Sequence, residues 1–585
     1  MARGRFSEKK QVVSVKFPIG TARISIEQKE ADRFIPTIKN YFSSNRMDTV
    51  LIHTATGLWP MLEYELDIVQ RELDCGNRVI FMYCRGSVGV CPANPPRSGQ
   101  ARKQRYCLEC QSRVKSGLKW LEPGDGRLEA VEYDQYTHTE EDSIQLLMDK
   151  LDRSDRSVAT IKRMVNFEGV DVFEASYSTL MTHIRDSELN LEYHWNSLKQ
   201  LLRVGISSYY SASSHIAYYA PDRVYIYNGR ISRYRPLMRL VQRQEKELFV
   251  YEYPGRDYLH YSLTRGTYPH DIGNTSKQLQ ELFLKTVPDP VIVKNEAETW
   301  FLNRSQRKLD GPQKLFLDSK LVHMKDDHSL PVWDKSVFNL VFFVSSQDEL
   351  GGIEENVTDL PFGQVEAIKR IMEEFPEIHC YVRIHPNLAG VEKGFVGNLF
   401  NLARFQGVTV IAPESPVSSY ALVNAADLVL VFASTIGVEA AFQKKPVISV
   451  GKSSYGYFKC TATVRTDKDL MRLIHGAVNG DFSGFPSEAK RYEGACAFAW
   501  AQLHFGEKPE YLERDSYFGG YMVRNGEKKE IKASGWIQVI NRLVDAPPKL
   551  VRGIKVFFSD PIKRKEFSAQ PLSVIKKGVF SVLPS

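Results

Sequence analysis

Residues 428–451 read LVLVFASTIGVEAAFQKKPVISVG, and this stretch decides the fold of the 585-residue chain. It contains an apolar run of strand length at 428–432, a helical pattern at 435–443 and a second apolar run at 447–450. A strand, a helix and a strand joined by short connections are typical of a parallel sheet covered by helices. The stretch therefore predicts part of an α/β domain.

The same alternation extends toward the N-terminus of this stretch. Strands are predicted at 337–345, 378–384 and 408–411, a helix begins at Gln364, and another helix is predicted at 418–426. Short apolar strands that alternate with amphipathic helices specify a parallel sheet with both faces covered. We predict a complete nucleotide-binding-type domain here.

An earlier strand-helix-strand unit runs from TVLIHT at 49–54 to RVIFMY at 78–83, and one further strand is predicted at 222–227. The chain is longer than one hydrophobic core usually organises. We therefore predict an α/β protein with two Rossmann-like domains that face a cleft. In open α/β sheets, ligands bind at the carboxyl ends of the strands.

Polar residues of the later domain fall at such strand ends. Ser434 and Thr435 lie where a helix begins, so backbone N–H groups and the helix dipole can attract a phosphate there, and Gly437 can let that phosphate approach the backbone. Glu439 lies one turn further along, where its carboxylate can accept hydrogen bonds from a ribose. The structural alternatives are a simple helix cap and a surface charge.

Arg383 and His385 close another strand at the same sheet edge. His385 can donate a hydrogen bond to a phosphate oxygen and help the nucleotide leave. Its structural alternative is a hydrogen bond to a backbone carbonyl. Because these residues share one edge of one sheet, we interpret them as a ligand site for a nucleotide donor.

The motifs RIHPN at 383–387 and SYALVNAADLVLVFASTIGVEAAFQKKPVISVG at 419–451 carry a resemblance. They resemble the GT-B glycosyltransferases of bacterial capsule and lipopolysaccharide biosynthesis, including the capsule polysaccharide biosynthesis family that contains Kdo transferases. They are also similar to motifs of bacterial sialyltransferases and teichoic-acid polymerases. The resemblance implies that His385, Ser434 and Thr435 contact the donor phosphate and that Glu439 contacts the nucleoside.

The segment DRVYIYNGR at 222–230 is similar to the N-terminal domain of the same enzymes. Asn228 and Arg230 follow its strand and are predicted to orient donor or acceptor, since a guanidinium suits a phosphate or a carboxylate sugar. Glycosyl transfer also needs a group that takes a proton from the acceptor hydroxyl. The catalytic candidates, each of which also has a structural alternative, are His53, Glu252, His270 and Asp271.

A cysteine cluster follows the strand at 78–83. Cys84, Cys91, Cys107 and Cys110 are separated by six, fifteen and two residues. Four thiolates can complete a tetrahedral metal shell, so we predict a structural zinc site, with an iron–sulfur cluster and free thiols as the alternatives. The glycines and prolines that follow Cys84 predict a loop that a metal would staple.

The net charge is +7, from 77 basic and 70 acidic residues, which is too small to indicate a nucleic-acid partner. Basic residues interleaved with bulky apolar ones gather at 549–585. This pattern predicts binding to an anionic membrane surface, with a solvated or docked tail as the alternative. No apolar run reaches the roughly 20 residues of a membrane span. We predict a cytoplasmic protein, peripheral on the inner face of the membrane.

The predicted organisation has four parts. They are an acceptor-side domain at 1–330 with the cysteine cluster, a nucleotide-sugar-binding domain at 331–475, a helical segment at 476–545 and a basic amphipathic tail at 546–585. The resemblance implies that the segment at 476–545 folds back onto the first domain. The predicted function is transfer of a sugar from a CMP-, CDP-, UDP- or GDP-linked donor to a capsular polysaccharide, an O-antigen or another glycan or lipid-linked glycan. The alternatives are a non-hydrolysing nucleotide-sugar epimerase and a non-catalytic or nucleic-acid-binding metal protein.

Overall fold

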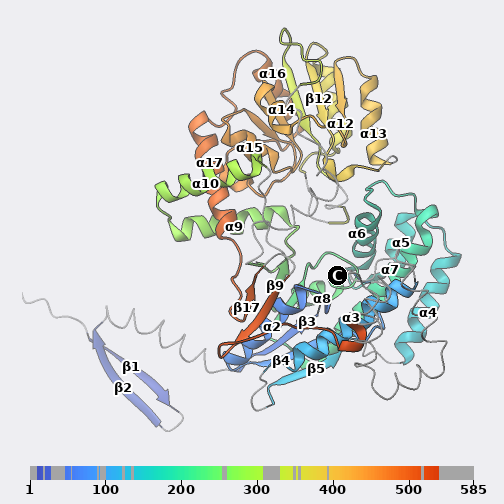
Figure 1. The fold of residues 1–585 in the computed structure, drawn as a ribbon, viewed down its shortest axis with the longest axis vertical. Coiled ribbons are helices and arrows are strands. Elements are labelled where there is room, and N and C mark those ends of the chain that lie inside the picture. Colours follow the sequence, from blue (N-terminus) through green and yellow to red (C-terminus); the bar gives the residue numbers. More distant parts are fainter. Residues whose placement is uncertain are drawn as a thin grey trace, which may run out of the picture.

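Two α/β units, one built on each of two six-stranded sheets, form the body of the computed structural model (Figure 1). No helix in the described part of the chain carries an apolar stretch long enough to span a bilayer. The residues that the structure describes are 10–17, 20–27, 47–54, 56–88, 91, 100–121, 126–133, 138–252, 260–306, 330–346, 351–353, 358–391, 394–515 and 519–538.

The first sheet has the strand order β10-β9-β8-β3-β4-β5. All neighbouring strands are parallel except β10, which runs antiparallel to β9. Its strands are β3 (Thr49–His53), β4 (Arg78–Tyr83), β5 (Leu128–Glu132), β8 (Arg223–Tyr227), β9 (Glu247–Glu252) and β10 (Ser262–Arg265).

Successive residues of β3 enter the cores on opposite faces of this sheet, as strand geometry requires. Val50 and Ile52 pack with α2 (Met61–Asp74), on which α3 (Gln100–Leu118) lies. Leu51 faces the other core, whose helices are α4 (His138–Arg153), α5 (Val158–Met164), α6 (Val172–Ile184), α7 (Leu191–Tyr219) and α8 (Arg235–Arg243).

The second sheet is parallel throughout, with the order β13-β12-β11-β14-β15-β16. Its strands are β11 (Asn339–Phe343), β12 (His379–Arg383), β13 (Val408–Ile411), β14 (Leu428–Val431), β15 (Val447–Ser449) and β16 (Ala462–Thr463). The α/β class with parallel sheets, predicted from the alternating pattern, is confirmed.

Helices cover both faces of the second sheet. Leu340 and Phe342 pack with α12 (Gln364–Glu374), α13 (Phe395–Asn401) and α16 (Asp467–Val478). The opposite core contains Val341 and Phe343 with residues of α9 (Ile272–Thr286), α10 (Pro290–Ser305), α14 (Ser419–Ala425), α15 (Ile436–Phe442) and α17 (Glu488–His504). The segment 272–305, assigned by prediction to the first domain, thus packs on the second sheet.

After α17 the chain crosses back to the first unit (Figure 1). There it forms the antiparallel strands β17 (Leu512–Arg514), β18 (Gly520–Arg524) and β19 (Glu527–Lys529). The Asp67 carboxylate of α2 accepts hydrogen bonds from the amides of Glu510 and Tyr511, both at 2.7 Å. Leu512, Met522 and Ile531 enter the α2 core, so this returning segment covers α2.

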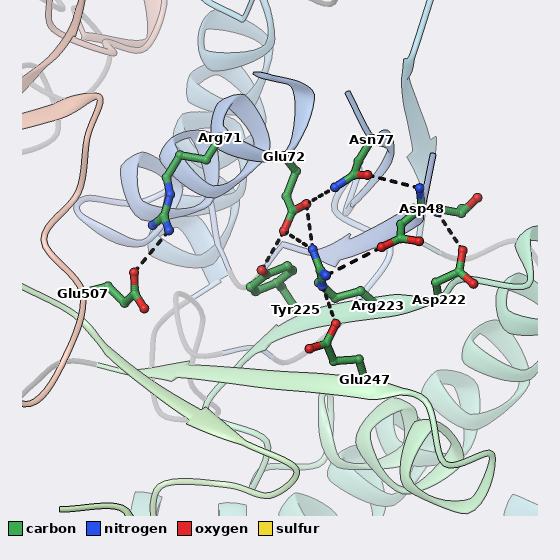
Figure 2. Close-up of polar contacts among 10 residues, drawn as sticks. Asp48, Arg71, Glu72, Asn77, Asp222, Arg223, Tyr225, Glu247 and Glu507 are labelled. Carbon is green, nitrogen blue, oxygen red and sulfur yellow. Dashed lines mark hydrogen bonds and ion pairs between the residues drawn. The ribbon is translucent and has the colours of Figure 1, made fainter. Parts of the chain in front are cut away.

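A polar network joins α2, β8 and β9 at the amino end of the first sheet (Figure 2). Arg223 donates to Glu72 at 3.0 Å and to Glu247 at 2.6 Å, and the Tyr225 hydroxyl donates to Glu72 at 2.7 Å. Beside it, Arg71 pairs with Glu507 of the returning segment at 3.2 Å. These ionic groups lie at the edge opposite the carboxyl ends of the strands.

The remaining described elements are two hairpins and three turns of 3-10 helix. β1 (Lys10–Phe17) and β2 (Gly20–Glu27) pair as an antiparallel hairpin, and β6 (Asn166–Phe167) pairs with β7 (Val170–Asp171) in a second, smaller one. Single turns of 3-10 helix occur at η2 (Pro386–Leu388), η3 (Leu402–Arg404) and η4 (Gly456–Phe458).

Candidate functional site

His385 follows β12 at the carboxyl end of the second sheet. Burial and the positive charges of Arg383 and Arg185 lower its pKa to about 4, so the imidazole is neutral at pH 7. Arg383 is itself buried, and its guanidinium donates to the carbonyls of Ala412 and Ser415, the latter at 3.1 Å. Arg383 therefore shapes the loop after β13 and acts on His385 through its charge.

Arg185 belongs to the first unit, where it ends α6 in the left-handed conformation with φ 65°. The next residue, Asp186, accepts a hydrogen bond from the Phe395 amide at 3.2 Å, and Asn398 donates to Glu188 at 2.6 Å. These contacts fix the 185–188 loop against the start of α13. They explain how a cation of the first unit comes to lie beside His385 of the second.

Asn228 and Arg230 lie in a tight turn after β8. The Asn228 side chain donates to Glu252 at 2.6 Å and accepts from the Arg230 amide at 3.1 Å. Arg230 donates to the Thr182 hydroxyl on the last turn of α6 at 2.8 Å. Burial and the charge of Arg230 lower the pKa of His270 well below its ordinary value. Four predicted residues thus form one group, linked through α6 to Arg185.

The other two catalytic candidates have structural partners. Asp271 caps α9 by accepting from the Asn274 amide at 3.0 Å. His53 is fully buried at the end of β3, edge-on to the rings of Tyr133 and Tyr234 at centroid distances of 4.6 and 5.5 Å. Burial lowers the pKa of His53 well below its ordinary value, and among the described residues neither ring nitrogen has a hydrogen-bond partner.

Glu439 is buried on α15, and Arg304 of α10 binds it. The Arg304 guanidinium reaches one carboxylate oxygen through Nη2 at 2.7 Å and through Nε at 2.8 Å, while the Tyr420 hydroxyl donates to the other oxygen. Arg304 also donates to the Thr435 hydroxyl at 3.2 Å. A ribose hydroxyl that donates to Glu439 would therefore bind a carboxylate that Arg304 and Tyr420 already hold in place.

Ser434 and Gly437 are arranged around Tyr455. The Tyr455 hydroxyl donates to the Ser434 carbonyl at 2.8 Å, and a Cβ on Gly437 would lie 2.3 Å from that hydroxyl. The absence of a Cβ on Gly437 thus leaves room for the Tyr455 hydroxyl. The sequence did not indicate this contact. Ser434 is half-buried and Thr435 is exposed, and their contact with a donor phosphate stays a prediction.

Sequence reasoning missed two residues of this edge. Ser345 follows the central strand β11, and its hydroxyl accepts from the Ala433 amide at 3.1 Å, which ties the end of β11 to the end of β14. The serine pair that follows VFFV at 341–344 was the available signal. Arg304 gave no signal, because its partner Glu439 lies 135 residues away.

The four predicted metal ligands come from one region of the first unit. Cys84 follows β4 and Cys91 lies beyond it, while Cys107 and Cys110 lie on α3, where part of the predicted loop is helical. Across the described ranges, no group of three or more His, Cys, Asp or Glu side chains is arranged to hold a metal ion. The predicted zinc site is therefore not confirmed.

Comparisons with known proteins return solved structures only. No protein-family model matches the sequence, and neither does any curated protein. The beta Kdo 2,4 transferase KpsC of Thermosulfurimonas dismutans is similar at 16% identity, over 55% of this chain and 87% of that chain, with a TM-score of 0.29.

Two other classes are similar as well. The UDP-GlcNAc 2-epimerase of Neisseria meningitidis bound to UDP-GlcNAc matches at 10% identity, over 79% of this chain and 95% of that chain, with a TM-score of 0.24. The wall teichoic acid polymerase TagF matches at 9% identity, over 83% and 96% of the two chains, with a TM-score of 0.19. These solved structures include a Kdo transferase and a teichoic acid polymerase, two of the classes that the motifs of this chain resemble.

Proposed function

We propose that this chain is a glycosyltransferase that moves a sugar from a nucleotide-sugar donor to a surface glycan, such as a capsular polysaccharide, an O-antigen or a lipid-linked glycan. Two α/β units support this proposal, because transfer between two large substrates needs a surface for each. The observation that carries it is the contact of the 185–188 loop of the first unit with the start of α13 in the second, which brings Arg185 within electrostatic reach of His385 at the ligand edge.

The donor is assigned to the second unit. Glycosyl transfer from a nucleotide leaves negative charge on the departing phosphate, and fixed positive groups around it lower the barrier. Arg383 and Arg185 supply such charge. The imidazole of His385 is neutral at pH 7, and its remaining N–H can donate a hydrogen bond to the phosphate. Ser434 and Thr435 are proposed to complete the phosphate site, with Glu439 toward the nucleoside.

The acceptor is assigned to the first unit. A neutral imidazole can take a proton from an acceptor hydroxyl, and the charge next to His270 keeps that ring neutral. Glu252 lies in the same group through its bond to Asn228. We propose His270 or Glu252 as the base, with Arg230 orienting an anionic group of either substrate. Asp271 and His53 are weaker candidates, because Asp271 caps α9 and His53 is buried against two tyrosine rings.

Nucleotide binding tests the donor site. Thermal unfolding of the full chain with CMP, CDP, UDP and GDP should show a rise in melting temperature with at least one of them, since a ligand of the folded state stabilises it according to its affinity. The Ser434→Ala/Glu439→Gln variant should lose the shift. The matched control Lys277→Ala, exposed on α9, should keep it. Full nucleotide binding by the double variant would contradict the assigned site.

Incubation with nucleotide sugars separates transfer from epimerisation. The proposed transferase should release free nucleotide slowly without an acceptor and faster with a glycan acceptor. Conversion of the donor sugar into its epimer without an acceptor would favour the non-hydrolysing epimerase instead. Salt-sensitive binding to RNA or DNA in place of nucleotide-sugar binding would favour the nucleic-acid-binding alternative.

The basic tail at 546–585 lies outside the described residues, so its binding to an anionic membrane surface stays a prediction. Together with a cytoplasmic, peripheral location, it forms part of the proposal because surface glycans are assembled at membranes. Co-sedimentation of the full chain with vesicles that contain anionic lipid should exceed co-sedimentation with neutral vesicles. Removal of residues 546–585 should abolish the difference.

A further inference from the structure

Lys452 lies in the loop after β15, at the carboxyl end of the second sheet. The Gly451 amide donates to the Phe432 carbonyl at 2.8 Å, which ties this loop to the end of β14, next to Ser434. The Ser449 hydroxyl donates to the Gly451 carbonyl at 2.8 Å and braces the same turn. Lys452 therefore belongs to the sheet edge to which the donor phosphate is assigned.

The same loop packs on the first turns of α9. The Tyr457 amide donates to the buried Ser276 hydroxyl at 3.1 Å, and Gln280 donates to the Tyr457 carbonyl at 2.7 Å. Closer to the start of the helix, a Cβ on Gly273 would lie 3.9 Å from Cδ of Lys452, which is ordinary van der Waals contact. The loop is thus fixed to β14 on one side and to α9 on the other, with Lys452 between the two attachments.

The start of α9 is where the chain passes from the first unit to the second. Tyr268 is buried in a core of the first unit, and Leu279 is buried in a core of the second. His270, one of the two proposed bases, lies at this crossing, three residues before Gly273. Lys452 thus lies where the assigned donor edge meets the group assigned to the acceptor.

Two buried polar atoms at this crossing have no hydrogen-bond partner among the described residues. They are Nδ2 of Asn274, on the first turn of α9, and Nδ1 of His270. Buried polar atoms without a partner cost free energy, so native proteins usually satisfy them with protein, water or a ligand. Lys452 is only partly buried, so a ligand can reach its ammonium. An ammonium and an amide NH₂ group both donate hydrogen bonds, and together they suit an anion.

We propose that Lys452 and Asn274 bind the donor phosphate that leaves with the nucleotide, on the side of the donor site that faces His270. This inference rests on the proposed function. In the transfer step, the bond between the anomeric carbon and the phosphate oxygen breaks, and its electron pair stays on the phosphate. The acceptor oxygen forms the new bond to that carbon, and its proton passes to the base. Lys452 keeps its own proton and stabilises the charge that develops on the phosphate.

Calorimetric titration of the full chain with nucleotides and nucleosides tests the lysine. CMP, CDP, UDP and GDP are the probes, and cytidine, uridine and guanosine are the matched ligands without phosphate. Lys452→Ala should weaken nucleotide binding about tenfold to a hundredfold, as expected for the loss of a hydrogen bond from a charged group, and should leave nucleoside binding unchanged. Lys452→Arg should recover part of the loss. Lys285→Ala, exposed at the other end of α9, is the control and should bind like the wild type.

Asn274→Asp is a second variant at the same turn, and it keeps the size of the side chain. Its carboxylate would repel a phosphate, so it should weaken nucleotide binding while the melting temperature without ligand stays close to that of the wild type. Unchanged nucleotide affinity in both variants would overturn this inference and leave the proposed transfer standing. Equal losses of nucleotide and nucleoside affinity would overturn it too. A wild-type chain that binds none of the nucleotides would overturn the donor site itself, and this inference with it.

Discussion

Arg304 and Glu439 form a buried ion pair that joins α10 to α15, with Nη2 and Nε of the arginine 2.7 and 2.8 Å from the same carboxylate oxygen. The side chains are 13% and 5% exposed. This pair connects the segment between the two sheets to the residue proposed to meet the nucleoside. It orients that carboxylate whether or not a donor is present.

Removal of Arg304 should therefore destabilise the second unit. Arg304→Met removes the cation from the buried Glu439 carboxylate and leaves the Tyr420 hydroxyl as its donor, which should lower the free energy of unfolding by about 3 kcal/mol. The double variant Arg304→Met/Glu439→Leu should recover part of that loss, because no charge is left buried. Chemical denaturation followed by fluorescence measures both. Lys294→Ala, at an exposed pair 3.9 Å long on the same helix, is the control and should change little.

The charge of Arg185 should control the protonation of His385. Arg185→Ala removes one of the two cations that lower the pKa of His385, so that pKa should rise from about 4 toward its ordinary value. The pKa of His385 is lower in the folded state than in the unfolded state, so the free energy of unfolding decreases as the pH falls from 6.5 toward 4. Arg185→Ala should show a smaller decrease over the same pH range. NMR titration of histidine-labelled protein, with His385→Gln for assignment, reads the pKa. Arg404→Ala is the exposed control, and an unchanged pKa of His385 in Arg185→Ala would refute the electrostatic effect of Arg185.

The contact between the units should depend on Gly394. A Cβ there would lie 2.0 Å from an Asp186 carboxylate oxygen, and the φ of 64° is costly for any other residue. Gly394→Ala should therefore separate the 185–188 loop from α13 and increase hydrogen exchange at the Phe395 amide. Gly480→Ala shares the strained backbone, with φ 77°, but its Cβ would meet no atom of the described residues within 4 Å. It should leave that exchange unchanged, and equal effects of the two variants would contradict the role of the contact.

Glu63 should give the first unit an unusual pH dependence. Burial raises the pKa of Glu63 to about 7, although Arg113 donates to its carboxylate. The folded state therefore binds this proton more tightly than the unfolded state, whose pKa is near 4.5, and the contribution of Glu63 to stability falls as the pH rises from 4.5 to 7. Glu63→Gln should remove that fall. The gain over wild type should be larger at pH 8 than at pH 5 in chemical denaturation, whereas the exposed control Glu373→Gln should show no such trend.

The sheets could be predicted from the sequence because their strands are short, apolar and separated by helices. The run LVLV became β14, and the helix predicted from Gln364 begins at Gln364. Because parallel strands end at the same edge of a sheet, polar residues that follow them, such as Ser434 and His385, lie at that edge. This much follows from local pattern, without knowledge of partners.

What could not be predicted depends on contacts between distant segments. Apolar residues on one side of α2 predict a half-buried helix, yet Glu63, Glu65 and Asp67 are buried as well. Glu63 accepts a hydrogen bond from Arg113 of α3, and Glu65 accepts one from Tyr251 of β9. Asp67 is covered by the returning segment, whose backbone amides donate to it. Likewise, the Tyr455 side chain fills the space beside Gly437. From the sequence alone, the approach of a phosphate explains the glycine equally well. No periodicity in the sequence records such long-range pairings.

The returning segment makes the core of the first unit depend on residues that follow the second sheet in the sequence. Leu512, Met522 and Ile531 complete a core whose strands β3, β4 and β8 all precede that sheet. During synthesis, the side of α2 that these residues cover stays open to water until the second unit has been made. The first unit can therefore complete its core only after the second has been synthesised.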